Sequence, residues 1–75
     1  MTSRELLEKI KEDYENRGMW ISDIATELHA PYETIRAIIV SLGYFRGKKI
    51  RMISLGTLLN DNYIRSSLEK IAINL

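Results

Sequence analysis

The residues of this sequence that could do chemistry are few, and they favour binding over catalysis. Among the usual nucleophiles, general bases and metal ligands, the chain has no cysteine and a single histidine, His29. A zinc site draws several ligands from these two residue types, so neither a thiolate site nor a histidine cluster can form. The HExxH, GxGxxG and GxxxxGK[ST] motifs are also absent. We therefore expect no enzyme, no metal and no cofactor.

Positive charge is concentrated in one part of the chain. Residues 1–35 carry four basic and eight acidic side chains, whereas residues 36–53 carry five basic side chains and no acid. The five are Arg36, Arg46, Lys48, Lys49 and Arg51. Such a local excess on a molecule of net charge +1 is the electrostatic footprint of a polyanion site. The alternative is a solvated basic hairpin without a partner.

The length and hydropathy of the chain predict a small single-domain protein. Its 75 residues predict one domain, 1–75, with a small core, because a chain of this size buries only about 60% of its unfolded surface. The longest unbroken apolar run, Ala37 to Val40, is far shorter than the ~20 residues that span a bilayer. The first residues lack the apolar region of a signal peptide. We expect a cytoplasmic protein that does not enter a membrane.

Local signals predict four helices and a hairpin. Thr2 and Glu5 form a capping box, Gly18 can end the first helix in the left-handed conformation, and Ser22 is expected to cap the second helix. The loop Gly47-Lys48, with glycine first, has the composition of a type II′ turn. The predicted elements are helices at 2–17, 22–28, 31–42 and 60–74 and a hairpin at 44–54 that pairs Phe45 with Ile50.

Trp20 and His29 each allow two interpretations. We expect Trp20 to anchor the core, because indole rings carry much of the buried area in small domains. The alternative, a platform on which a nucleic-acid base stacks, would need further aromatic residues interleaved with basic residues nearby, and the neighbouring sequence lacks them. We expect His29 to be a turn residue, and the alternative is a phosphate contact that strengthens when the ring is protonated.

The order of the predicted elements resembles that of winged helix-turn-helix DNA-binding proteins. The matching residues are Ile24, Ala25, Leu28, Ala30, Ile35 and Ile38. In that family a small residue lies where the two helices cross, here Ala25, and an apolar residue ten positions later, here Ile35, holds the second helix. The turn position often held by glycine is His29, which tolerates left-handed backbone better than most residues. The resemblance covers residues 3–55 and implies a mainly α fold with a small β-hairpin: a three-helix core, a wing and a C-terminal helix.

The helix predicted at 31–42 has an outward face suited to reading bases. With Ile35, Ile38, Ile39 and Leu42 inward, the outward and flanking residues are Tyr32, Glu33, Thr34, Arg36, Ala37, Val40 and Ser41. An arginine can bond guanine O6 and N7, a glutamate can accept from cytosine N4, and apolar side chains can meet the thymine methyl group. Phosphates would be contacted by Tyr32 and Thr34, and by Arg46, Lys48, Lys49 and Arg51 of the hairpin.

The resemblance and this face together predict a regulator of transcription that binds double-stranded DNA sequence-specifically, a small repressor. The alternative is a winged-helix protein–protein module that docks on a polymerase or replication complex. In the C-terminal helix, the 4-3-4 spacing of Ile64, Leu68, Ile71 and Leu75 predicts a homodimer seam, since two-fold operators match dimeric readers. The alternative is that this helix folds back on the first helix of the same chain.

Overall fold

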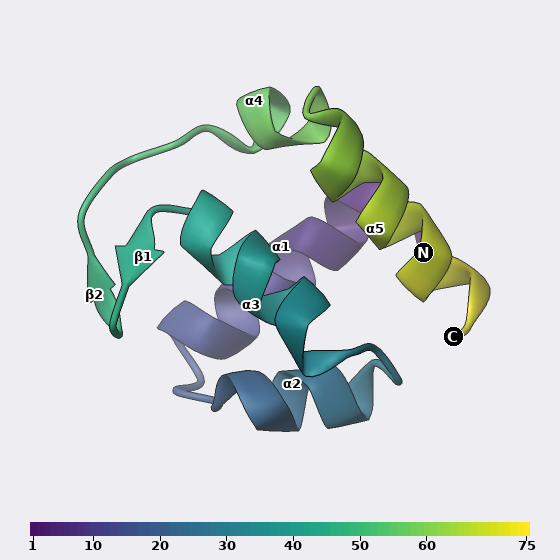
Figure 1. Cartoon of the computed structure of the whole chain (residues 1–75), viewed down its shortest axis with the longest axis horizontal. Coiled ribbons are helices and arrows are strands. Elements are labelled where there is room, and N and C mark those ends of the chain that lie inside the picture. The colour runs from purple at the N-terminus through teal and green to yellow at the C-terminus, as the bar shows by residue number, and fades with distance from the viewer.

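Five helices and one two-stranded hairpin make up the fold (Figure 1). The computed structural model describes all residues, 1–75. The elements in chain order are α1 (Ser3–Glu15), α2 (Ile21–Glu27), α3 (Tyr32–Ser41), β1 (Tyr44–Phe45), β2 (Lys48–Lys49), α4 (Leu55–Leu59) and α5 (Asn62–Ile73). The predicted class, mainly α with a small antiparallel hairpin, is confirmed. None of the helices is long and apolar enough to cross a membrane.

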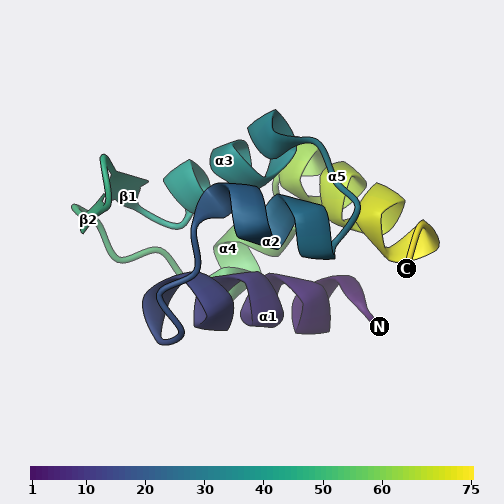
Figure 2. The ribbon, with the colours of Figure 1, turned by 90° about the horizontal axis from the view of Figure 1, so that it is seen from below.

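Helix α1 is the base on which the other helices are arranged. It packs against α2, α4 and α5, whereas α3 packs against α2 and β1. Figure 2 shows α1 along one side of the molecule and α3 along the opposite side, and Figure 1 shows α2 lying beside both helices. The hairpin projects from the end of α3 (Figure 1). The hairpin continues from α3 and also contacts the C-terminal end of α1, through Tyr44 and Lys49.

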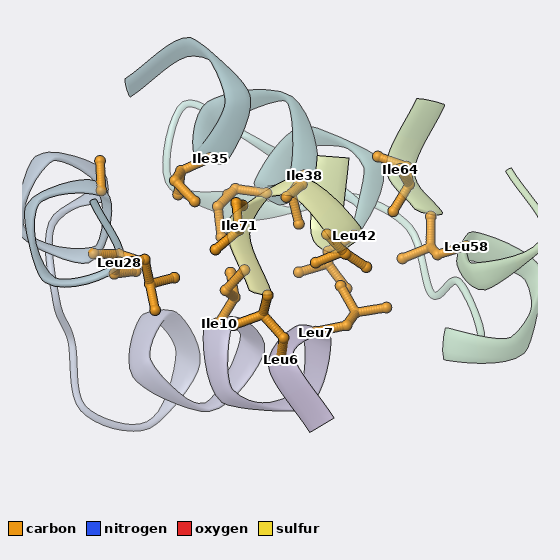
Figure 3. Packing of buried hydrophobic residues seen from close by; sticks show 14 of the residues in the cluster. Leu6, Leu7, Ile10, Leu28, Ile35, Ile38, Leu42, Leu58, Ile64 and Ile71 are labelled. Carbon is orange, nitrogen blue, oxygen red and sulfur yellow. The ribbon is translucent and has the colours of Figure 1, made fainter. Parts of the chain in front are cut away.

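The core consists of 15 buried apolar side chains contributed by all five helices and β1 (Figure 3). Helix α3 and its C-cap supply Ile35, Ile38, Ile39 and Leu42, as its periodicity predicted. Helix α1 supplies Leu6, Leu7 and Ile10 from one face. Because burying one such side chain contributes roughly 1.5–3 kcal/mol, this cluster is the main source of stability.

Helix α5 closes the core of its own chain, which was the alternative to the predicted dimer seam, and dimerisation itself stays a prediction. Ile64, Leu68 and Ile71 are buried within the chain, and only Leu75, beyond the end of the helix, remains 54% exposed. Figure 3 shows Ile71 between Ile10 of α1 and the residues of α3. The physical reason is that α2 and α3 do not cover the whole apolar face of α1, and α5 lies on the remainder.

The predicted helix ends lie within two residues of the observed ones. The capping box is present, with the Glu5 amide 3.1 Å from Thr2 Oγ1 and the Thr2 amide 2.8 Å from Glu5 Oε1. The prediction that Ser22 caps α2 is wrong, because the N-cap position belongs to Trp20 and has no side-chain cap. The amides of Asp23 and Ile24 donate to the Trp20 carbonyl at 3.0 and 3.1 Å, so Ser22 already lies inside the first turn.

The hairpin is shorter than the predicted 44–54, and its register differs from the predicted one. The observed pairs are Tyr44 with Lys49 and Phe45 with Lys48. The loop is therefore Arg46-Gly47, with φ of 51° and 80°, and two positive φ values characterise a type I′ turn. The predicted type II′ loop and the pairing of Phe45 with Ile50 are wrong. Glycine takes the second loop position, where it adopts positive φ without strain.

Gly43 explains why the strands stop at residue 49. Its carbonyl accepts the amides of Ile50 and Arg51 at 2.7 and 3.3 Å, which ends the regular ladder. A Cβ at Gly43, where φ is 105°, would lie 2.2 Å from the Arg51 carbonyl oxygen. The following chain leads into α4, a helix that we did not predict, whose cap Ser54 accepts the Thr57 amide at 3.2 Å.

Candidate nucleic-acid interface

Helices α2 and α3 form a helical hairpin with a tight turn. His29 occupies the turn with φ of 53°, the left-handed conformation expected at the position often held by glycine. The Ala30 amide donates to the Ala25 carbonyl at 2.9 Å and closes the turn. Ala25 and Ile35 are both buried in the core, in the two helices that pack together here. The imidazole of His29 is exposed, as in a turn residue.

The outward face of α3 is accessible along its length. Glu33 and Arg36 are exposed, and Val40 is 44% exposed although it is apolar. Ala37 is half-buried at the margin of this face. The residues expected to read bases therefore lie on one exposed helix surface.

The two residues predicted to flank this face lie on different sides of α3. Tyr32 lies on the hairpin side, where it lines a hollow together with Arg36 and residues of β1. Thr34 lines a separate hollow on the α5 side, together with Lys70 and His29. The structure therefore does not bring Tyr32 and Thr34 together.

The basic residues of the hairpin region divide into two groups. Arg46, Lys48 and Arg51 are exposed, and none of them forms an ion pair. Lys49 differs, because its Nζ lies 2.9 Å from Glu15 Oε2. Lys49, which was predicted to contact a phosphate, therefore forms an ion pair within the chain.

The carboxylate of Glu15 connects the hairpin to α1. It accepts hydrogen bonds from the Tyr44 hydroxyl and from Lys49, and Lys11 Nζ lies 2.8 Å from its other oxygen. Burial alone would raise the pKa of Glu15, but hydrogen bonds from Lys11, Tyr44 and Lys49 lower it to about 2. Burial and the hydrogen bond to Glu15 raise the pKa of Tyr44 to about 12. The charged carboxylate and the neutral phenol therefore hold β1 and β2 in place.

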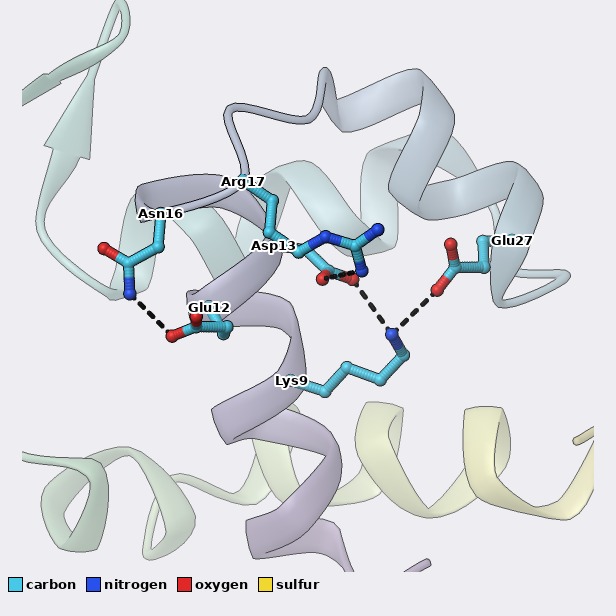
Figure 4. Close-up of polar contacts among 6 residues, drawn as sticks. All are labelled: Lys9, Glu12, Asp13, Asn16, Arg17 and Glu27. Carbon is cyan, nitrogen blue, oxygen red and sulfur yellow. Dashed lines mark hydrogen bonds and ion pairs between the residues drawn. The ribbon is translucent and has the colours of Figure 1, made fainter.

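A second charged cluster connects α1 to α2 (Figure 4). Asp13 is only 2% exposed, and Lys9 Nζ and Arg17 Nη1 each lie 3.1 Å from its oxygens. Lys9 Nζ also lies 2.8 Å from Glu27 Oε1 of α2, and the hydrogen bonds that Lys9 donates to Glu27 and Asp13 raise its pKa. This cluster was not predicted from the sequence, although Asp13 follows Ile10 at helical spacing on the buried face of α1.

Trp20 is 76% exposed, so the prediction that it anchors the core is wrong. It lies in the extended link before α2, where the neighbouring Met19 and Ile21 pack against the core instead. Because successive side chains in an extended segment point to opposite sides, Trp20 faces outward. It lines a hollow of about 590 Å³ together with Tyr32 and Arg46.

Comparison of the chain with protein-family models, with curated proteins and with solved structures finds no match in any of the three. The resemblance to winged helix-turn-helix proteins therefore depends on the residues quoted above and on the arrangement of the elements. That arrangement is a helical hairpin with an exposed second helix, followed directly by a short basic β-hairpin.

Proposed function

We propose that this protein is a small cytoplasmic repressor that binds double-stranded DNA sequence-specifically. Helix α3 enters the major groove, and the β-hairpin acts as a wing on the flanking phosphates. The observation that carries the proposal is that the exposed face of α3 continues into three hairpin-region cations without ion-pair partners. Such cations can neutralise phosphates without first breaking an internal ion pair.

Base readout is assigned to the middle of α3. Arg36 bonds the O6 and N7 atoms of a guanine, and Glu33 accepts from a cytosine N4. Ala37 and Val40 contact thymine methyl groups, which accounts for apolar side chains on an exposed helix face. The half-exposed Tyr32 and Thr34 bind phosphates on the two edges of the groove.

The hairpin region contributes affinity for DNA that does not depend on the base sequence of the DNA. Arg46, Lys48 and Arg51 each contact a phosphate and release counterions, so each contributes about 0.9 to the slope of log K against log salt. Lys49 has an indirect role, since its ion pair with Glu15 holds the hairpin against α1.

Selection of duplex sites from a random pool, followed by fluorescence anisotropy, tests the proposal. The Arg36→Ala variant should bind a selected site more weakly by about 1–3 kcal/mol and should lose discrimination at one base pair. Arg4→Ala is the matched control, because Arg4 is also an exposed arginine but lies on α1, across the molecule from α3. Equal losses on selected and random duplexes would show that Arg36 contacts only phosphate. Failure to enrich any site would refute sequence-specific binding.

The second candidate is a winged-helix module that docks on a protein, such as a polymerase or replication complex. The 44% exposure of Val40 favours it, because an apolar side chain on a helix face also suits a protein interface. A titration with random duplex DNA at low salt separates the two candidates. A docking module shows no salt-sensitive DNA binding, whereas a DNA reader does.

A further inference from the structure

Three large aromatic side chains are exposed around one region of the surface. Trp20 is 76% exposed, Tyr32 is 50% exposed and Phe45 is 54% exposed. Tryptophan and phenylalanine normally bury most of their surface, and clustered exposed aromatics mark interaction sites. In this protein they come from the start of α2, the start of α3 and β1.

These side chains line two adjoining hollows, which we call the aromatic cleft. One hollow, of about 590 Å³, is lined by Trp20, Tyr32 and Arg46 among others. The second, of about 340 Å³, is lined by Phe45 together with the same Tyr32 and Arg46. Because the two hollows share these walls, they adjoin each other between the hairpin, α3 and the link from α1 to α2.

The aromatic cleft has positive charge available for a ligand. Arg46 lines both hollows, Arg36 lines the second, and neither arginine forms an ion pair. The one carboxylate in the lining, Glu15, is bonded to Lys11, Lys49 and Tyr44. An incoming anion therefore meets two guanidinium groups without ion-pair partners, of which that of Arg46 lies over the Phe45 ring at 5.2 Å, and a carboxylate whose charge is already balanced.

We propose that the aromatic cleft binds an unpaired nucleic-acid strand. Its bases stack on Trp20, Tyr32 and Phe45, and its phosphates bind the guanidinium of Arg46. Exposed aromatics combined with cations are the two elements of single-strand recognition, since every base has a π-face and every linkage is negative. A proline-rich peptide also binds aromatic grooves, but it would leave the arginines without a counter-charge.

This site goes beyond the proposed reading of a duplex by α3. Tyr32, Arg36 and Arg46 belong to both surfaces, but Trp20 belongs to the aromatic cleft alone. It is also the only tryptophan of the chain, so its emission reports on this cleft and on no other site. Single-strand binding can therefore be measured separately from duplex binding.

The test titrates the full chain with an oligothymidylate of about 12 nucleotides, a length typical of strand-binding sites. We expect saturable quenching of Trp20 emission as bases stack on the indole. An oligonucleotide of the same length whose sugars lack bases supplies the same phosphates without π-faces, and it should bind more weakly and leave the emission unchanged. Equal affinity for the two strands would overturn the proposal, because attraction would then be purely electrostatic.

Substitutions of Trp20 measure how much its side chain contributes to binding of the single strand. Trp20→Ala should weaken oligothymidylate binding about 5- to 150-fold in fluorescence anisotropy, the range expected for losing one stacked base. Trp20→Phe should restore part of that loss. Tyr63→Ala is the control, because Tyr63 is an exposed aromatic on α5, outside the aromatic cleft. Circular dichroism should show that all three variants keep the fold, since both positions are more than half exposed.

The remaining outcomes separate this inference from the proposed function. If Trp20→Ala weakens a duplex as much as the single strand, Trp20 is a duplex contact and the inference fails, while DNA reading by α3 stands. If no duplex site can be selected but the oligothymidylate still quenches Trp20, the proposed function fails and the inference stands. Quenching by a proline-rich peptide and not by the strand would also overturn the inference.

Discussion

Replacing Glu15 by glutamine should destabilise the protein and loosen the hairpin. Glutamine keeps the shape of the side chain but removes the charge that binds Lys11 and Lys49. At about 1.4 kcal/mol per pKa unit, the difference between the ordinary 4.5 and about 2 sets an upper bound of about 3.5 kcal/mol. Because the side chains of Lys11 and Lys49 are 38% and 30% exposed, solvent screening reduces the expected loss to about 1–2 kcal/mol.

The assay is urea unfolding followed by circular dichroism at several pH values. Because the folded pKa of Glu15 is depressed, its contribution is complete above about pH 4.5 and is lost as the pH falls from 4.5 toward 2. The difference in unfolding free energy between the natural chain and Glu15→Gln should follow this course. At neutral pH the variant should melt about 4–16 °C lower, given the size of this domain.

Glu12→Gln is the matched control for this experiment. Glu12 lies on the same helix and carries the same charge, but it is exposed, and its carboxylate accepts a hydrogen bond only from the Asn16 side chain. Its replacement should change stability by less than about 0.5 kcal/mol. Equal losses for the two variants at pH 7, or a loss for Glu15→Gln that persists unchanged to pH 2, would refute the role assigned to Glu15.

Three further predictions concern packing, backbone and the hairpin cations. Leu68→Ala should lower the unfolding free energy by about 2–5 kcal/mol in urea titrations, because the side chain is fully buried; an unchanged midpoint would show that α5 is not part of the core. Gly43→Ala should destabilise by more than about 1 kcal/mol in the same assay, whereas Gly56→Ala, with open space around it, should not. Lys48→Ala should reduce the salt slope of DNA binding by about 0.9 and leave stability unchanged. Lys49→Ala should instead lower the melting temperature, because it removes the ion pair with Glu15, and equal melting temperatures for the two variants would contradict this distinction.

Local interactions made much of the helical framework predictable from the sequence. The capping box of α1 joins residues three apart, and the apolar stripe of α3 repeats within two turns, so both depend only on neighbours along the chain. The exposed face of α3 followed from the same periodicity, because a helix that buries Ile35 and Ile39 must turn Arg36 outward. The left-handed turn at His29 is local too.

Contacts between residues far apart in the chain decided the hairpin register, the position of α5 and the exposure of Trp20. No pattern of closely spaced residues predicts such contacts. The hairpin register depends on Gly43 meeting the backbone of Arg51, and Lys49 is engaged by Glu15, 34 residues away. Helix α5 has a stripe that suits a second chain as well as its own, and only the uncovered face of α1 selects the intramolecular position. Whether an aromatic side chain in an extended segment is buried depends on which side of the segment faces the core. Before α2, Met19 and Ile21 face the core, so Trp20 faces solvent.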